Sequence, residues 1–375
     1  MKQKGRNMLK HEVISVTPAI VDIACDLTGR EQVYLELCAL LSCKPGEWKA
    51  VHDKELIEQL LGLVAQVANF SIDEDFESLS TTEGVDIAAG STGLNMLSAL
   101  TKIQRKSSAI VSTVGADEKG NPDAVSAFFT KDVERTGIYQ YAIPKTGVNP
   151  LVLVFSHKEQ PDKVTAMHPG VASQLETLPP STDKSRVVHV DAYDLQREPA
   201  ALTLDNLIKS NKPPIALGLG NPSILQGQLK ERILGYIENR QVHYLMGNAE
   251  EYAALLGTDT VTSLEQAMSL NLGRLAPYVL ITLGEKGIIG FDHGKATYQR
   301  PFRQEKPVNT SGAGDTAAGV FLSGILAGQD FALTLKEAAY FSSRIVGMLA
   351  SRFANGREAL YRRNHIDTIS IDPEE

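Results

Sequence analysis

Short runs of β-branched and other apolar residues alternate along the chain with longer segments whose apolar residues recur three and four positions apart. The short runs predict strands at His11–Val16, Ser108–Thr113, Leu151–Phe155, Val187–Val190, Ile215–Leu219, Tyr244–Met246, Val279–Leu283 and Gly287–Phe291. The longer segments predict helices, among them Leu94–Ile103, Leu229–Ile237, Glu250–Leu256 and Leu264–Gly273. This alternation predicts an α/β fold with a mostly parallel sheet covered by helices on both faces.

Two regions interrupt this pattern. Residues Leu27–Phe70 read as a long, mainly helical insertion, and Ile138–Phe155 read as a hairpin with Pro144-Lys-Thr-Gly147 as its turn. We expect these pieces, approximately residues 22–70 and 138–155, to form a small lid on a single domain that spans residues 1–375. Ligands bind such sheets at the carboxyl ends of the strands, so a lid would cover that edge. Residues 364–375 are predicted to be a mobile tail.

Composition and charge exclude several classes of protein. The 375 residues contain 45 acidic and 37 basic side chains, a net charge of −8 that disfavours a nucleic-acid partner. The sequence holds no apolar run of about 18 residues, so we expect no membrane span. Three cysteines without a Cys-x-x-Cys pair argue against a disulfide framework or a zinc site and favour a reducing, cytoplasmic compartment. His189 falls inside a predicted strand and is expected to be a core residue.

The most informative stretch runs from Asn309 to Leu326. Its small residues at Ser311–Gly314 allow a tight turn, and the apolar spacing that follows predicts a helix. The first turn of a helix directs unpaired N–H groups outward, an arrangement that binds anions. A carboxylate beside such a site, Asp315, suits the removal of a proton from an attacking hydroxyl. The tetrapeptide Gly-Ala-Gly-Asp alone fits a loop with an N-cap aspartate better.

The string Asn309-Thr-Ser-Gly-Ala-Gly-Asp315 resembles the signature of the phosphofructokinase-B, or ribokinase-like, family of carbohydrate and nucleoside kinases, usually Asp-Thr-x-Gly-Ala-Gly-Asp. The resemblance implies a ribokinase-like three-layer α/β/α sandwich with a small lid. It also implies that Asp315 is the catalytic base. The implied anion hole consists of Gly312, Ala313 and Gly314, and Thr310 of the same string is assigned to the nucleotide. Asn309 departs from the family pattern.

Two further motifs follow the family order and concern the nucleotide. Asn248-Ala-Glu-Glu251 matches Asn-x-x-Glu, which implies that Glu251 organises Mg²⁺ through water, although a helix cap gives the same spacing. Thr282-Leu-Gly-Glu-Lys-Gly287 resembles the family's nucleotide-binding turn, although a plain hairpin would also fit. The implied nucleotide contacts are Asn248, Glu251, Thr282, Gly284, Gly287 and Thr310. The implied cofactors are ATP and Mg²⁺, with K⁺ as a further candidate.

The acceptor side is represented by an aspartate and by a second family signature. The resemblance implies substrate contacts at Asp22, Gly90, Ser91 and Asn95. Asp22 is expected just after the first strand; without the resemblance it reads as a solvated loop residue. The signature departs at Ala89, which replaces a glycine, and at Leu94, which stands where the family has asparagine. Asn95 comes one residue late, and a helix turns about 100° per residue, so Asn95 could point elsewhere.

The predicted function is that of an ATP-dependent kinase, with the 5′-hydroxyl of a nucleoside as the favoured acceptor. The long helical insertion, Met167-His-Pro-Gly170 and Gly220-Asn-Pro-Ser223 resemble the layout of adenosine and inosine-guanosine kinases. The alternatives are a sugar kinase and a catalytically degenerate relative that only binds a ligand. The expected partners are the small-molecule substrate and ATP, with no nucleic acid or membrane, and the protein is expected to be a monomer or a homodimer.

Overall fold

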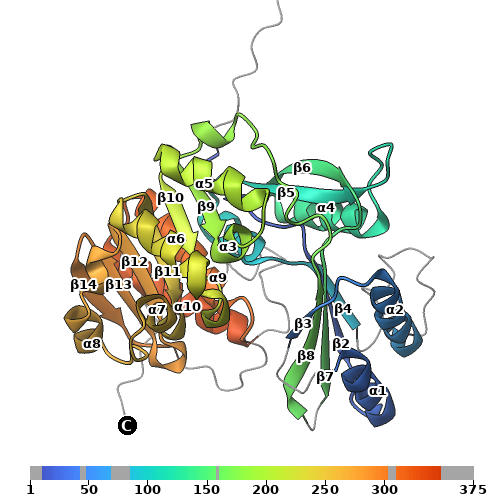
Figure 1. Ribbon diagram of the computed structural model, residues 1–375. Coiled ribbons are helices and arrows are strands. Elements are labelled where there is room, and N and C mark those ends of the chain that lie inside the picture. Colours follow the sequence, from blue (N-terminus) through green and yellow to red (C-terminus); the bar gives the residue numbers. More distant parts are fainter. Residues whose placement is uncertain (1–10, 43–47, 69–84, 158–159, 303–309, 348–375) are drawn as a thin grey trace, which may run out of the picture.

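The computed structural model describes residues 11–42, 48–68, 85–157, 160–302 and 310–347 (Figure 1). The predicted tail at 364–375, and Asn309, lie outside the described residues. Within the described segments, no helix is both long and apolar enough to cross a bilayer.

The larger of two sheets has nine strands and follows the predicted alternation. In order across the sheet they are β14 (Lys295–Gln299), β13 (Ile288–Asp292), β12 (Tyr278–Thr282), β11 (Val242–Asn248), β10 (Ile215–Gly218), β9 (Val187–Asp191), β1 (Val13–Val16), β5 (Ser108–Ala116) and β6 (Tyr139–Thr146). The pairs β12–β13 and β13–β14 are antiparallel, and every other neighbouring pair is parallel. The prediction of a mostly parallel sheet is therefore confirmed.

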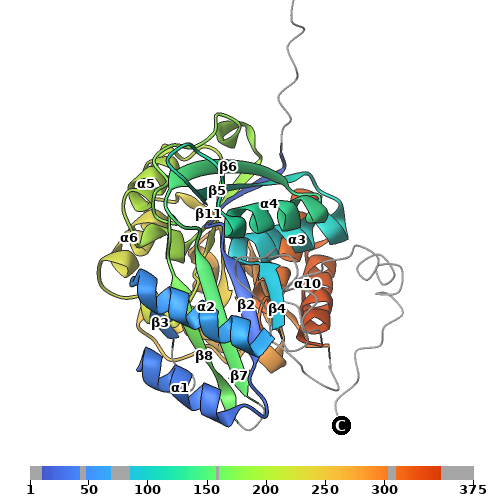
Figure 2. The same ribbon diagram turned by 90° about the vertical axis from the view of Figure 1, so that its right-hand side faces the viewer.

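Helices cover both faces of this sheet, which explains why its central strands are apolar without a polar alternation. In β12, Val279 and Ile281 pack into one core while Leu280 packs into the other. The first face carries α5 (Ala200–Ser210), α6 (Gly227–Glu238), α7 (Ala249–Leu256) and α8 (Leu264–Ser269); the second carries α3 (Thr92–Gln104), α4 (Ala124–Thr136), α9 (Ala313–Leu326) and α10 (Phe331–Val346) (Figures 1 and 2). Three layers result.

The smaller sheet lies beside the larger one and carries its own helices. Its order is β3 (Trp48–Ala50), β8 (Gln160–His168), β7 (Leu151–His157), β2 (Val21–Asp26) and β4 (Val85–Ala89). Helices α1 (Glu31–Leu41) and α2 (Lys54–Ala68) lie along this sheet (Figure 2), and Leu37 and Leu60 share a buried core with Ile23. The prediction of a mainly helical insertion is confirmed where the chain is described, with β3 between the two helices.

The predicted hairpin at Ile138–Phe155 is wrong. Strand β6 belongs to the large sheet, parallel to β5, whereas β7 belongs to the small sheet, parallel to β2. Pro144 lies within β6 instead of forming a turn, and an edge strand tolerates proline because one of its sides has no partner strand. Only the second half of this predicted lid piece therefore lies in the small sheet.

Asn149 ties the two sheets together where the chain crosses between them. It is 2% exposed, and its Oδ1 accepts hydrogen bonds from the Gly115 N–H at 3.3 Å and the Ser126 hydroxyl at 3.0 Å. Its Nδ2 donates to the carbonyl of Ala19, in the connection from β1 to β2. One buried amide thus links the end of β5, the start of α4 and the crossover into the small sheet, which fixes how the sheets meet.

Candidate active site

The first turn of α9 has the backbone features of an anion-binding helix start. The helix begins at Ala313, and its N-cap, Gly312, has a φ of 76°, a left-handed conformation that glycine adopts at little cost. Gly312 has no side chain with which to cap this end, and a Cβ added to Gly314 would meet only open space. The first N–H groups of a helix lack intrahelical acceptors, so the uncapped turn offers donors to a bound anion. Thr310, just before it, is exposed, and its carbonyl accepts from the Ala313 N–H at 3.4 Å.

Asp315 lies in this first turn and has the electrostatics of a proton acceptor. Its Oδ2 accepts a hydrogen bond from Asn95 Nδ2 at 2.9 Å. Burial raises the pKa of Asp315 from 3.8 to about 7, the charges of Asp191 and Asp22 act in the same direction, and the bond from Asn95 opposes them. A carboxylate with a pKa near neutrality takes and releases protons readily at physiological pH.

The sequence left open where Asn95 points, and in the structure its side chain contacts Asp315. Leu94, in the place of the family asparagine, is fully buried in the core, and the next residue along α3 reaches the carboxylate of Asp315. Helix α9 can approach α3 this closely because Gly319 has no side chain: a Cβ there would lie 2.2 Å from the carbonyl oxygen of Met96. The Asn95 amide therefore lies beside Asp315, and the hydrogen bond that it makes there is to the Asp315 carboxylate.

A cavity of about 110 Å³ opens at the carboxyl ends of the large sheet's strands, beside Asp315. The sequence-predicted residues that line it are Asn248, Glu251, Thr282, Gly314 and Asp315. They come from β11, α7, β12 and α9, so residues far apart in the sequence meet at the edge where such sheets bind ligands.

Glu251 serves both as a helix cap and as a cavity wall. Its Oε2 accepts from the Asn248 N–H at 2.9 Å and its Oε1 accepts from Asn248 Nδ2 at 2.8 Å, while the Asn248 side chain caps α7 in return. Glu251 is 7% exposed, and burial raises its pKa to about 8, with further contributions from the charges of Asp191 and Asp315. The two interpretations left open by the sequence are thus compatible.

The donors around the cavity fit a hydrated Mg²⁺ ion better than a directly ligated one. Across the described segments, no three His, Cys, Asp or Glu side chains come close enough together to hold a metal. Both oxygens of Glu251 are already engaged by Asn248. Mg²⁺ readily keeps several of its waters. Burial raises the pKa of Glu251 and Asp315 most, and nearby carboxylates raise both further; a cation here would offset that second effect.

The segment Thr282–Gly287 forms the hairpin between β12 and β13. Thr282 lines the cavity, and Gly284 lies in the short 3₁₀ turn that follows. Gly287 has a φ of 97°, and a Cβ there would lie 2.3 Å from the carbonyl oxygen of Gln299. The hairpin itself therefore requires this glycine, and its contact with a nucleotide stays a prediction.

The acceptor-side residues surround the start of α3. Asp22 follows β1 in the chain, as expected, and lies within β2, opposite Ala88 of β4, so the alternative of a solvated loop residue is wrong. Gly90 leaves room for this carboxylate, since a Cβ there would come within 2.1 Å of Asp22 Oδ2. Ser91 is the N-cap of α3, and its hydroxyl oxygen accepts from the Leu94 N–H at 3.2 Å. Its hydroxyl oxygen is thus engaged in capping the helix.

Sequence reasoning missed Asp191, which closes the cavity from β9. It is 4% exposed and accepts hydrogen bonds from the Thr92 hydroxyl at 3.1 Å and the Tyr193 N–H at 3.0 Å. Burial raises its pKa to about 6. The available signal was its place directly after the predicted strand Val187–Val190, at the edge where such sheets bind ligands. His189 is buried and contacts Ser15 Oγ at 2.9 Å, as expected of a core residue, yet it also lines the cavity.

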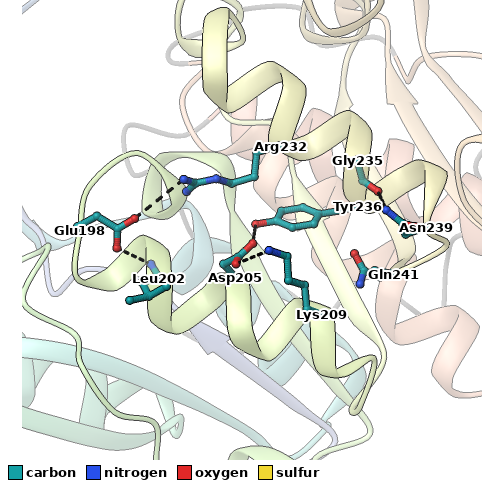
Figure 3. A pocket seen from close by; sticks show the side chains of 9 residues that line it. All are labelled: Glu198, Leu202, Asp205, Lys209, Arg232, Gly235, Tyr236, Asn239 and Gln241. Carbon is teal, nitrogen blue, oxygen red and sulfur yellow. Dashed lines mark hydrogen bonds and ion pairs between the residues drawn. The ribbon is translucent and has the colours of Figure 1, made fainter.

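A larger cavity of about 510 Å³ lies between α5 and α6, and Asp315 is not among the residues that line it. Figure 3 shows these lining residues. Its charged side chains are occupied with one another. Asp205 accepts from Lys209 at 2.7 Å and from the Tyr236 hydroxyl at 2.8 Å, and Arg232 lies 4.0 Å from Glu198. Because these charges neutralise each other, this cavity attracts a charged ligand less strongly than the carboxylates around Asp315 attract a cation.

Comparisons with known proteins identify the family to which this chain is similar. The pfkB family carbohydrate kinase domain matches residues 61–354. A putative 1-phosphofructokinase of Mycoplasma pneumoniae is 23% identical over 250 residues, 58% of this chain and 83% of that protein. An adenosine kinase of Schizosaccharomyces pombe is 28% identical over 168 residues, 41% of this chain and 48% of that protein.

The crystal structure of an adenosine kinase from Sinorhizobium meliloti superposes with a TM-score of 0.74 at 18% identity, covering 95% of this chain and all of that chain. At this identity the likeness concerns the fold. The predicted ribokinase-like α/β/α sandwich is therefore confirmed.

Proposed function

Because the chain belongs to the pfkB family of carbohydrate kinases, we propose that it transfers the γ-phosphate of ATP to the 5′-hydroxyl of a nucleoside. Family membership makes it a phosphotransferase with an alcohol group as acceptor. The observation that carries the proposal is the position of Asp315, a carboxylate with a pKa of about 7 in the uncapped first turn of α9. The adenosine kinases among the similar proteins support a nucleoside as the acceptor.

In the proposed reaction, Asp315 takes the proton from the acceptor hydroxyl as its oxygen attacks the γ-phosphorus, and ADP leaves. The N–H groups of Gly312 and Gly314 stabilise the negative charge on the transferred phosphoryl group, joined by that of Ala313 once it leaves its long bond to the Thr310 carbonyl. Asp22 accepts hydrogen bonds from acceptor hydroxyls. Mg²⁺, held through water near Glu251, would neutralise phosphate charge.

The small sheet is the proposed lid. It carries Asp22 on β2, and this carboxylate is close enough to raise the pKa of Asp315. Closing the small sheet over the acceptor would exclude water and limit hydrolysis of ATP. Asn149, which joins the crossover to the large sheet, lies where such a movement would pivot.

A sugar or sugar phosphate as acceptor is the second candidate, favoured by the likeness to a putative 1-phosphofructokinase. A relative that binds ligands without transferring phosphate is the third, motivated by Asn309, Ala89 and Leu94. Asp315 and the first turn of α9 with glycine at its N-cap, which such a relative could lose freely, are both retained and argue against this candidate.

A coupled assay of ADP formation tests the choice. Mg-ATP is supplied with a panel of purine and pyrimidine nucleosides, ribose, fructose and fructose 1-phosphate. We expect turnover with a nucleoside, and phosphate on its 5′-oxygen by NMR. Turnover with sugars alone would keep the mechanism and reject the nucleoside. Tight binding of ATP and nucleoside without transfer would favour the non-catalytic relative.

Gly90→Ala tests whether Asp22 binds the acceptor. The new Cβ would lie 2.1 Å from Asp22 Oδ2, so the Asp22 carboxylate would have to move. A hydrogen bond to a charged group contributes about 1.5–3 kcal/mol, so KM for the acceptor should rise by about tenfold or more. KM for ATP should change little. An equal rise in both values would show that the substitution distorts the whole site.

The predicted use of K⁺, the cytoplasmic location and the choice between monomer and homodimer stay predictions.

A further inference from the structure

The contact between α3 and α9 brings the side chain of Asn95 against Asp315, the proposed base. Asn95 is 7% exposed and lies in the first turn of α3, with its Nδ2 2.9 Å from Asp315 Oδ2. The close approach of the two helices at Gly319 leaves Asn95 little room to move away. The substitution of Leu94 for the usual asparagine therefore coincides with an amide one residue later that faces the base.

The amide has one favourable orientation toward an ionised carboxylate. With Nδ2 toward Asp315 it donates, and an ionised carboxylate can only accept. With the amide reversed, Oδ1 would face a carboxylate oxygen, and only a protonated Asp315 could then supply the hydrogen. In the observed orientation Oδ1 is buried without a hydrogen-bond partner. An unpaired buried oxygen is unfavourable, so the bond from Nδ2 to Asp315 must outweigh the loss at Oδ1.

We propose that Asn95 is a positioning residue that holds Asp315 in its ionised, proton-accepting form and in one orientation. This role rests on the proposed function, in which Asp315 is the base. It differs from a contact with the substrate, which the family resemblance implied for Asn95.

The groups around Asp315 show why such a donor is needed. Acidic side chains face it from three elements: Asp22 on β2, Asp191 on β9 and Glu251 on α7. The Tyr193 hydroxyl faces the same group, because burial and the charges of Asp191, Glu251 and Asp315 raise its pKa. His189 lines the same cavity, but burial lowers its pKa to about 4, so it is neutral. Burial and the charges of Asp191 and Asp22 favour protonated Asp315, and the bond from Asn95 opposes them.

Asn95→Leu tests the role, because leucine nearly matches asparagine in shape and lacks the donor. We expect the acid limb of kcat/KM, which falls as pH decreases through about 7 in the native protein, to move to higher pH. Loss of one hydrogen bond to an ionised carboxylate predicts a shift of about one pH unit. Activity should recover at alkaline pH, where Asp315 ionises without help. Asn95→Ser, which keeps a donor, should shift the limb less.

Gln104→Leu is the matched control. Gln104 is another buried amide of α3, and its Nε2 donates to Glu337 Oε2 of α10 at 2.8 Å, with Gln104 absent from the cavity lining. This variant loses the same kind of bond and should leave the acid limb in place. A limb that stays in place in Asn95→Leu while the alkaline plateau falls would overturn the proposal and leave Asn95 a packing role.

A second measurement does not depend on turnover. The carboxyl carbon of Asp315, identified by its loss in Asp315→Asn, is titrated by NMR in the native protein and in Asn95→Leu. A higher apparent pKa in the variant supports the proposal even if every acceptor in the panel fails. An unchanged pKa overturns it even if the enzyme is active. Failure of the proposed function and failure of this inference are thus distinguished.

Discussion

Asp315→Asn is expected to lower kcat by about a thousandfold, the contribution typical of a positioned general base. The amide oxygen of the variant can still accept a hydrogen bond from Asn95, so the contact between α3 and α9 should survive. Binding of ATP should persist, because the N–H groups of the first turn of α9 belong to the backbone. Single-turnover kinetics with the best acceptor would measure the loss directly.

The same variant should be more stable than the native protein at neutral and alkaline pH. The carboxyl has a pKa of about 7 in the folded protein against 3.8 ordinarily, so the unfolded chain ionises first as pH rises. The cost to the native fold therefore begins above pH 3.8, is complete above about pH 7, and is absent below both values. Asparagine at 315 avoids this cost, and the difference in Tm between the two proteins should grow across that window.

Asp259→Asn controls for the substitution itself. Asp259 is exposed in the loop after α7 and does not line the cavity beside Asp315, so its replacement should leave kcat unchanged. Near-native turnover in Asp315→Asn would remove Asp315 from the role of base. A loss of activity together with a lower Tm at neutral pH would indicate misfolding instead of the removal of a proton acceptor.

Local patterns predicted the large sheet well because its strands and helices are each specified by neighbouring residues. Seven of the eight predicted strands lie in that sheet, since buried parallel strands read as continuous apolar runs. The α9 turn was equally visible, because small residues followed by helical spacing lie in one short string. The exception among the strands, Leu151–Phe155, pairs with β2 and β8, and no local pattern states which sheet a strand joins.

What escaped prediction depends on contacts between distant segments. The segment before β7 was predicted as a hairpin because Pro144 and Gly147 are typical turn residues. In the structure the backbone of β6 instead forms its hydrogen bonds with β5. The direction of Asn95 depends on how closely α9 approaches α3, which the sequence signals only through a single glycine. Asp191 becomes part of the site because β9 lies near the centre of the sheet, a position set by pairing and not by its own residues.

Gly319→Ala should therefore damage both the fold and the site. Its Cβ would lie 2.2 Å from the Met96 carbonyl oxygen and 3.1 Å from Ala99 Cβ. Because the nearest atom belongs to the backbone of α3, a side-chain rotation cannot relieve the contact and the helices must separate. Overpacking of this kind costs about 1–3 kcal/mol of unfolding free energy. The separation would also pull Asn95 away from Asp315, so kcat should fall together with stability.

Gly235→Ala provides the opposite expectation within the same fold. Gly235 lies in the interior of α6, where a Cβ would meet nothing within 4 Å. Alanine there should raise the unfolding free energy by about 0.5–1 kcal/mol through helix propensity, with kcat unchanged. Urea unfolding and kcat at saturating substrate measure both variants. If Gly319→Ala instead gained stability as Gly235→Ala does, the helices would not be in close contact at Met96. The base would then have to be held by something other than the packing of α3 against α9.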